Sequence, residues 1–419
     1  MNATNLNVGY VGMSHLGINS AVATAEKGTS VYCFDEDKKL IDDLNKLNIN
    51  IDEPDLIEKL SLFKNRINFT TNVNDLNNCD LIFISKDVKT DENGNSDLSE
   101  VNNLIDIINN EINDDIILII LCQVPPGFTR KINRNKDYLY YQVETLIFGR
   151  AIERALNPER IILGCVNSEH KIKKNYREFL NLFECPIIPM VYESAELAKT
   201  AINIVLAAQV STANSLAEIC ELSKGDWNEI IPALNLDKRI GFHAYLQTGL
   251  GISGGNIERD LSTVSRISTN LGGNNIFFNG IIEHSIYRKN WPWKIFQEKI
   301  NVEVKRISIL GLSYKVNTNS IKNSPSIDLI KKLKNYEITV FDPIIKTLPD
   351  YSNIKISVSL KEAVTDSDVL FIMVKCEEFK ELNDLEFIQI IKKKTIIDPY
   401  RVIDTSKFQP HKHYVLGKN

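Results

Sequence analysis

Short apolar runs alternate with helix-like segments along residues 1–190. Residues 18–27 have the alanine-rich composition of a helix, and Gly28 follows as its C-terminal stop. Because the apolar runs are nearly continuous, they predict strands of a parallel sheet that helices cover on both faces. The predicted strands are residues 6–11, 30–34, 80–85, 116–122 and 161–164.

The pattern changes in the middle of the chain. Residues 192–224 place Ala, Leu, Ile and Val at helical spacing, and no Pro or Gly occurs before Gly225. This stretch predicts one long helix or two abutting helices. Helix-like spacing continues to residue 300 and is interrupted by the glycine-rich loop 248–256.

The α/β alternation returns after residue 300. The predicted fold class is therefore α/β, with two Rossmann-like doubly wound domains joined by a central helical region that contains a long helix. The predicted boundaries give domains of residues 1–190, 191–300 and 301–419. The strands predicted in the last domain are residues 306–312, 337–341, 369–374 and 395–397.

Composition narrows the class of protein. The 419 residues carry a formal net charge of -5, so no basic excess draws the chain to nucleic acid or to a membrane surface. The seven cysteines are widely spaced and form no CxxC pair, which favours reduced cytosolic thiols over disulfides or a metal site. The N-terminus lacks the pattern of a signal peptide, and we expect a cytoplasmic protein.

Two overlapping glycine patterns are alternative candidates for the dinucleotide-binding loop. Gly9 and Gly12 resemble the end of a GxGxxG pattern, but its first position would be Asn7 and the helix after it would be too long. The alternative pattern runs from Gly12 to Gly17 and falls between the first predicted strand and the first predicted helix. Asp35 follows at the end of the next strand, where an acid binds the ribose hydroxyls.

This second pattern predicts an NAD site. Glycines allow the pyrophosphate to approach the backbone, the helix N-terminus supplies N–H donors, and the acid disfavours the extra phosphate of NADP. Ser14 stands in place of the middle glycine, which leaves open a degenerate loop that binds nothing. The residues predicted to bind NAD here are Gly12, Ser14, His15, Leu16, Gly17 and Asp35.

Further motifs follow in a fixed order along the chain. They are Val124-Pro125-Pro126-Gly127, Glu144-Thr145-Leu146, Gly149-Arg150-Ala151, Asn157-Pro158-Glu159-Arg160, Ala195-Glu196-Leu197-Ala198-Lys199, Asp237-Lys238-Arg239-Ile240-Gly241, Gly311-Leu312-Ser313-Tyr314-Lys315, Ser324-Pro325-Ser326 and Phe341-Asp342-Pro343. Together they resemble the UDP-glucose/GDP-mannose dehydrogenase family over essentially the whole chain.

The resemblance implies a function for each domain. It implies an N-terminal NAD-binding domain, a central helical region that makes a homodimer, and a C-terminal domain that binds a UDP- or GDP-linked sugar. Members of the family oxidise the C6 alcohol of the sugar to a carboxylate in two NAD-dependent steps. The second step passes through a thiohemiacetal and a thioester on a cysteine.

By position in the motifs, the resemblance assigns four catalytic groups. Lys199 and Asn203 polarise the sugar oxygen, and their i, i+4 spacing places them on one helix face. Glu144 activates water, although Val143 replaces the proline before it. Asp260 pairs with the catalytic lysine through water as a general base. The alternatives are a surface lysine beside a packing asparagine, and an N-cap aspartate.

The resemblance also implies binding positions. The backbone of Thr145 and Leu146 faces the pyrophosphate, and Arg239 reaches the sugar across the dimer interface. Lys315 lies near the substrate, and Lys322 stands where an arginine contacts the nucleotide. Gly251 and Gly254 belong to the substrate loop, and Gln123 replaces a threonine beside NAD.

The chain departs from the family pattern at positions that the resemblance places near the reacting groups. Asn256 stands where the family has its nucleophilic cysteine, and no cysteine occurs between Cys220 and Cys376. Cys122 is a candidate for a displaced nucleophile. It ends an apolar strand, however, and a cysteine in such a position is more often buried and unreactive. Residues 85–90 (SKDVKT) replace a segment rich in Pro and Thr.

Three functions are consistent with these departures. The first is an oxidoreductase limited to two-electron alcohol–carbonyl interconversion, with epimerisation of the sugar as a variant, because an amide forms no thioester. The second is a four-electron dehydrogenase that uses water activated by Glu144. The third is a catalytically silent binder of nucleotide sugars.

Overall fold

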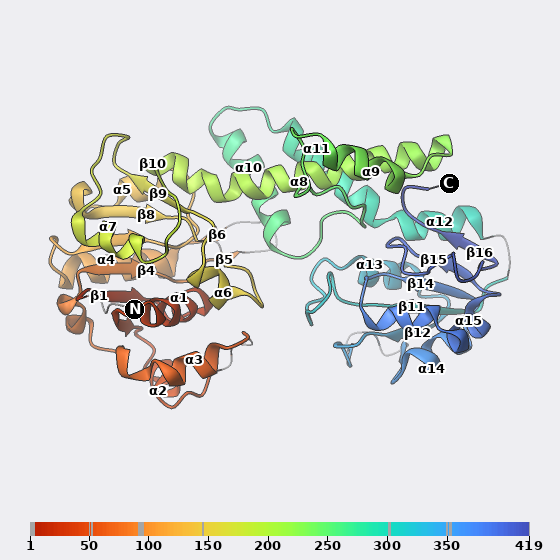
Figure 1. Cartoon of the computed structure of the whole chain (residues 1–419), viewed down its shortest axis with the longest axis horizontal. Helices are drawn as coiled ribbons and strands as arrows, with labels where there is room; N and C mark the ends of the chain where they lie inside the picture. The colour runs from red at the N-terminus through yellow and green to blue at the C-terminus, as the bar shows by residue number, and fades with distance from the viewer. Residues whose placement is uncertain are drawn as a thin grey trace. The chain divides into compact units, whose positions relative to one another are not determined.

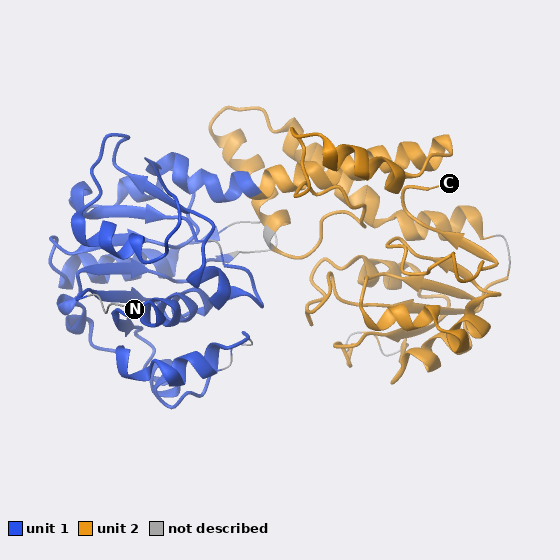
Figure 2. Ribbon diagram, viewed as in Figure 1, with its two compact units in different colours: residues 1–202 blue, residues 203–419 orange. Residues whose placement is uncertain are grey.

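The computed structural model describes residues 5–49, 51, 53–90, 96–144, 146–300, 303–348, 351 and 354–418. The chain divides into two compact units, residues 1–202 (unit 1) and 203–419 (unit 2) (Figure 2). The division falls inside the long helix α8 (Tyr192–Ser223), whose 32 residues form a single helix rather than two. The predicted boundaries at residues 190 and 300 stay predictions.

Unit 1 contains an eight-stranded sheet in the order β10-β9-β8-β7-β4-β1-β2-β3 (Figure 1). Its neighbouring strands are parallel except for the antiparallel pair β8 and β9. The strands are β1 (Asn7–Val11), β2 (Ser30–Phe34), β3 (Ile67–Thr70), β4 (Leu81–Ile84), β7 (Ile117–Ile120), β8 (Leu139–Gln142), β9 (Ile161–Cys165) and β10 (Ile187–Val191). A short hairpin pairs β5 (Lys89–Thr90) with β6 (Ser96–Asp97).

Helices cover both faces of this sheet. Along β4, Leu81 and Phe83 pack into one core and Ile82 and Ile84 into the other, which explains why the strand is apolar throughout. The helices are α1 (His15–Glu26), α2 (Lys38–Asn45), α3 (Leu56–Leu62), α4 (Ser99–Glu111), α5 (Phe128–Lys131), α6 (Ala151–Leu156) and α7 (Lys174–Asn181). The 3-10 turns are Lys64–Arg66, Val73–Asn78 and Lys136–Tyr138.

Unit 2 contains the second parallel sheet, in the order β13-β12-β11-β14-β15-β16. Two apolar cores again lie on its two faces. The strands are β11 (Arg306–Leu310), β12 (Glu337–Phe341), β13 (Ile354–Ile356), β14 (Val369–Ile372), β15 (Thr395–Ile397) and β16 (Lys412–Tyr414). The sheet's helices are α13 (Pro325–Lys332), α14 (Leu360–Thr365), the 3-10 turn Glu378–Asn383 and α15 (Leu385–Ile391).

Helices precede this sheet along the chain. After α8 come α9 (Trp227–Leu236), α10 (Asn256–Asn270), α11 (Ile276–Lys289) and α12 (Trp291–Lys299). The predicted fold class, two parallel-sheet domains joined by a helical region with a long helix, is confirmed. Among the described residues, none of the helices combines the length and apolar character needed to cross a bilayer.

Candidate active site

The turn between β1 and α1 has the geometry of a dinucleotide loop. Gly12 follows β1 with a φ of +94°, a left-handed conformation that favours glycine. A Cβ on Gly17 would collide with the carbonyl oxygen of Gly12, so the first turn of α1 also requires glycine there. Gly9 lies inside β1, paired with Tyr32 and Ile82, so the competing pattern begins within a strand.

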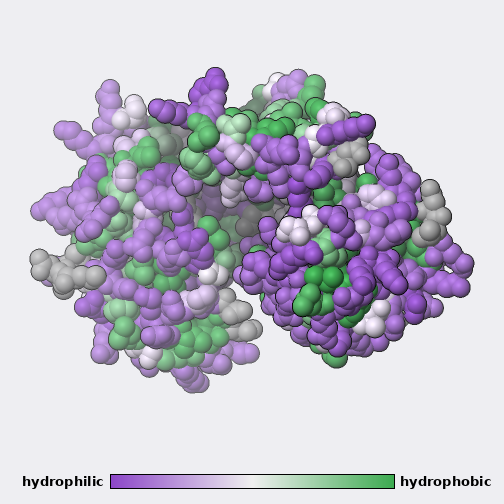
Figure 3. Space-filling view, turned by 45° about the vertical axis from the view of Figure 1, so that its right-hand side comes forward, coloured by the Kyte–Doolittle hydropathy of each residue, from purple (hydrophilic) through white to green (hydrophobic). Residues whose placement is uncertain are grey.

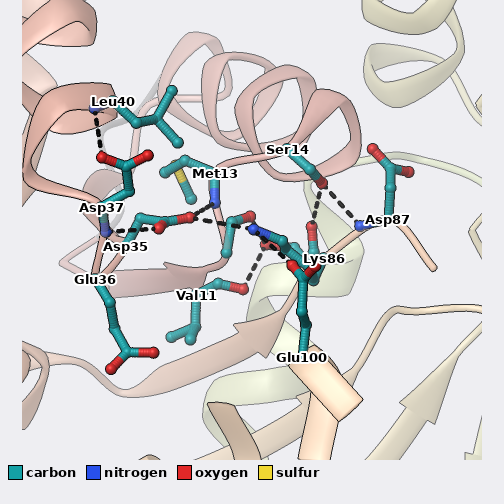
Figure 4. Close-up of polar contacts among 12 residues, drawn as sticks. Val11, Met13, Ser14, Asp35, Glu36, Asp37, Leu40, Lys86, Asp87 and Glu100 are labelled. Atoms are coloured by element: carbon teal, nitrogen blue, oxygen red, sulfur yellow. Dashed lines mark hydrogen bonds and ion pairs between the residues drawn. The ribbon is translucent and has the colours of Figure 1, made fainter. Parts of the chain in front are cut away.

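Asp35 lies beside this turn, directly after β2. Its carboxylate is buried and accepts hydrogen bonds from the backbone N–H of Met13 at 2.8 Å and of Asp37 at 3.0 Å (Figure 4). The Lys86 ammonium lies 3.8 Å from the same carboxylate. A helix N-terminus, two required glycines and a buried acid fit NAD, which accepts a hydride when bound. Asp35 would hold its ribose hydroxyls.

Glu53 ties this turn to a second loop, a connection that the sequence does not reveal. Its buried carboxylate lies 2.8 Å from Nε2 of His15 and accepts the backbone N–H groups of Gly149 at 2.7 Å and Ala151 at 3.2 Å. The His15 ring also packs against Phe148, with 4.3 Å between ring centroids. Glu53 therefore fixes His15, a predicted NAD-binding residue, relative to residues 148–151.

Replacing Glu53 with glutamine is expected to destabilise unit 1 by about 1–3 kcal/mol and to weaken NAD binding. The amide NH₂ group faces backbone N–H donors, so one buried donor loses its acceptor. Thermal unfolding with and without NAD measures both effects. The matched control is Glu153→Gln on α6, whose side chain is 56% exposed, and we expect little change there. Equal effects of the two substitutions would contradict this role for Glu53.

Gln123 lies after β7, at the sheet edge where the parallel strands β1, β4 and β7 end. The loop that follows is held by Glu196 of α8. The Glu196 carboxylate accepts the backbone N–H of Gly127 and, at 2.7 Å, that of Thr129. Burial raises the pKa of Glu196 above its usual value. The sequence placed Glu196 in a motif but gave it no role.

Glu144 and Lys199 form an ion pair within unit 1. Glu144 follows β8 and Lys199 lies on α8, and their side chains are only 15% and 20% exposed. The Glu144 carboxylate also accepts the backbone N–H of Leu146, so this N–H is engaged within the chain. Thr145 lies outside the described residues. Lys199 is therefore a paired, largely buried cation rather than a surface lysine.

Asn203 and Asp260 form a second polar pair within unit 2. The Asn203 amide donates to the buried Asp260 carboxylate at 2.6 Å, and Arg259 Nε donates to the other carboxylate oxygen at 3.1 Å. Asp260 lies inside α10, whose N-cap is Gly255, so the alternative that it caps a helix is wrong. On α8, Lys199 and Asn203 are one helical turn apart.

Two loops of unit 2 meet at the start of α10. They are the glycine-rich loop 248–256 and the loop between β11 and α13. Gly251 and Gly254 have φ values of +68° and +90°, and a Cβ on Gly254 would collide with the Tyr314 ring. Lys322 Nζ lies 4.0 Å from the point that a Cβ on Gly255 would occupy. The exposed Lys315 lies over the Tyr314 ring, with Nζ 5.7 Å from its centroid. Predicted substrate residues of both loops are thus brought together.

Three further candidate residues have different surroundings. Arg239 lies in the exposed turn after α9, where its guanidinium pairs with Asp237 at 2.6 Å. Asn256 is the first residue of α10, and its side chain lies outside the described part of the structure. Cys122 is fully buried and its thiol lies 3.3 Å from the carbonyl oxygen of Ile84. Burial raises the Cys122 pKa to about 12, which argues against a nucleophile.

Comparisons with known proteins agree with this architecture. Relatives include the UDP-glucose 6-dehydrogenase of Rickettsia felis, 29% identical over 98% of this chain and 96% of the relative. The UDP-glucose 6-dehydrogenase TuaD of Bacillus subtilis is 27% identical over 96% of this chain and 90% of its own length. The solved UDP-glucose dehydrogenase of Pyrobaculum islandicum has the same fold, with a TM-score of 0.82, 21% identity and 98% coverage of both chains.

Three models of one family cover most of the chain in order. They are the NAD binding domain at residues 6–183, the central domain at 193–284 and the UDP binding domain at 308–405. An NAD-binding domain and a nucleotide-binding domain on one chain are the parts of a nucleotide-sugar dehydrogenase. The chain therefore belongs to the UDP-glucose/GDP-mannose dehydrogenase family and is an NAD-dependent oxidoreductase.

Proposed function

We propose that this protein oxidises a CH–OH group of a nucleotide sugar and stops at the carbonyl, after one two-electron step. One observation carries the proposal: both polar pairs, Glu144–Lys199 and Asn203–Asp260, are present, while asparagine occupies position 256. Hydride transfer needs groups that stabilise an alkoxide and accept a proton, and these pairs supply them. Formation of the acid through a thioester needs a thiolate, which an amide does not supply.

Each residue has a defined task in this step. The Lys199 ammonium and the Asn203 amide stabilise the sugar oxygen as its O–H proton leaves and negative charge develops. Asn203 uses one amide N–H for Asp260, and an amide has a second N–H to donate to the substrate. Glu144 positions Lys199 and, together with Asp260, is a candidate proton acceptor. NAD, when bound, accepts the hydride from the sugar carbon that bears this oxygen.

The nucleotide that we infer is uridine diphosphate. The C-terminal match is to a UDP binding domain, and the curated relatives named above are UDP-glucose 6-dehydrogenases. Lys315 and Lys322 beside the Gly254 loop supply cations for the diphosphate. We also infer a reducing cytoplasmic setting, since the seven cysteines are unpaired thiols in the structure.

The test is the stoichiometry of NADH and sugar. The protein is incubated with NAD and UDP-glucose, GDP-mannose or other nucleotide sugars, and hydroxylamine traps any aldehyde. We expect one NADH per sugar and a trapped carbonyl, or an epimerised sugar when no trap is added. A carboxylate with two NADH per sugar would establish the four-electron alternative. Binding of the sugar without hydride transfer would establish the silent binder.

We further propose that the protein is a homodimer through its central helices. Of the 25 large hydrophobic side chains exposed in the described chain, 14 lie within residues 203–300. Leu216, Ile219 and Leu222 follow one another at helical spacing on α8 and are 41%, 57% and 80% exposed. Figure 3 shows such residues gathered on the helical part of unit 2. A second copy of the chain would cover a patch of this kind.

Replacing Ile219 with aspartate is expected to shift the protein from dimer to monomer, because a charge in an apolar interface is not compensated. Light scattering after size-exclusion chromatography measures the mass of the particle. The matched control is Val358→Asp, which changes an 89% exposed residue outside the helical region. A wild-type protein that is already monomeric would contradict the proposed dimer, and so would an Ile219→Asp variant that remains dimeric.

A further inference from the structure

Two departures from the family pattern contact each other at the dinucleotide loop. Ser14 replaces the middle glycine, and Asp87 lies in the segment after β4 that replaces a Pro/Thr-rich one. The Ser14 hydroxyl accepts the backbone N–H of Asp87 at 2.8 Å and donates to the carbonyl of Ser85 at 3.2 Å (Figure 4). Ser14 thus attaches residues 85–87 to the start of α1.

The Asp87 side chain then reaches the helix itself. Its carboxylate accepts the backbone N–H of Leu16, in the first turn of α1, at 3.2 Å. Ser14 is the N-cap residue of α1 but its side chain makes no capping hydrogen bond, so Asp87 supplies an acceptor from a different loop. A carboxylate is stabilised in this position because the first N–H groups of a helix carry partial positive charge.

The same N–H groups are those that hold the pyrophosphate in a dinucleotide-binding fold. One donor cannot serve two anions well, and a carboxylate beside a pyrophosphate adds repulsion between like charges. Asp87 is exposed at the surface of unit 1, so it can leave this position without opening the core. The Ser14 hydroxyl is what holds it in place.

We propose that Asp87 competes with the phosphates of NAD for the N-terminus of α1 and thereby lowers the affinity of the protein for NAD. Ser14 is the positioning residue for this competition. Phosphate binding displaces the Asp87 carboxylate from Leu16, while the ribose site at Asp35 is unaffected. The inference concerns cofactor affinity alone and does not depend on which sugar, or which number of electrons, the protein handles.

The test is calorimetric titration of the full chain with NAD, ADP and adenosine, without nucleotide sugar. Asp87→Asn keeps a hydrogen-bond acceptor for Leu16 and removes the charge. We expect this variant to bind NAD and ADP about tenfold more tightly, equivalent to about 1.4 kcal/mol, and adenosine as weakly as the wild type does. The control is Asp137→Asn, an exposed aspartate of unit 1 that lies beside His170, and it should change nothing.

A second variant tests the role of Ser14 as the positioning residue. Ser14→Ala removes the hydroxyl, so it should also tighten NAD binding, and the double variant with Asp87→Asn should gain less than the sum of the two. Thermal unfolding confirms that each variant is folded. An NAD affinity that falls or stays the same in Asp87→Asn would overturn the proposal, and so would a gain for adenosine equal to that for ADP.

Discussion

Replacing Lys199 with methionine is expected to lower kcat by about 10²–10³-fold, because the developing alkoxide loses its cation. The side chain is held in place by the ion pair with Glu144 and is 20% exposed, so few other groups can substitute for it. The affinity for NAD should not change, since the predicted cofactor residues lie at the β1–α1 turn, at Asp35 and at Gln123. Rapid-mixing measurement of NADH formation and calorimetry with NAD separate the two effects.

The matched control for Lys199 is Lys174→Met on α7, an 86% exposed lysine of the same unit. It changes the same charge and should leave kcat unchanged. An unchanged kcat in Lys199→Met would contradict the assignment of Lys199 as the cation that stabilises the reacting sugar oxygen. A parallel loss of NAD affinity would show instead that the ion pair with Glu144 supports the fold of unit 1.

Replacing Asn256 with cysteine is expected to convert the protein into one that forms a carboxylate. Residue 256 is the first residue of α10 and follows Gly254 and Gly255 beside Lys322. A helix N-terminus and a nearby cation both lower the pKa of a thiol, so the introduced side chain should react as a thiolate. It can add to the carbonyl product, and a second hydride transfer from that adduct gives a thioester that water hydrolyses.

The expected result for Asn256→Cys is two NADH per sugar and a uronate, where the wild type gives one NADH. The control is Asn270→Cys, which places the same side chain at the exposed C-terminal end of the same helix. The pH dependence of iodoacetamide labelling should show the lower thiol pKa at position 256. A reactive thiolate at 256 without acid formation would mean that more than one group of the acyl-transfer machinery is missing.

The sequence predicted the parts of the site that depend on local pattern. The loop at Gly12–Gly17 followed from its place between a strand and a helix, and the structure has the turn there. The lack of Pro and Gly in residues 192–224 predicted a helical stretch but left open one helix or two, and the structure has the single helix α8. The alternative to a general base for Asp260, a helix cap, was wrong because α10 begins four residues earlier, at Asn256, and helix boundaries are the least reliable part of a prediction from sequence.

The contacts that the sequence did not predict join distant segments. Glu53 lies 38 residues from His15, and Glu196 lies 69 residues from Gly127. Asp87 lies 71 residues from Leu16, although the unusual segment 85–90 marked its surroundings. Such pairs arise because the carboxyl ends of parallel strands gather residues of several βα units at one edge, and no local periodicity encodes that meeting.

The proposed limit to two electrons is tested most directly by the product of a single complete turnover. The wild-type protein, in excess over a nucleotide sugar that it oxidises, is mixed with saturating NAD, and the sugar product is identified by mass spectrometry while NADH is counted. The absence of a thiol at position 256 predicts at most one NADH per sugar and a product that is two hydrogens lighter than the substrate, or an epimer of unchanged mass if the carbonyl is reduced again. Two NADH per sugar and a carboxylate product would contradict it.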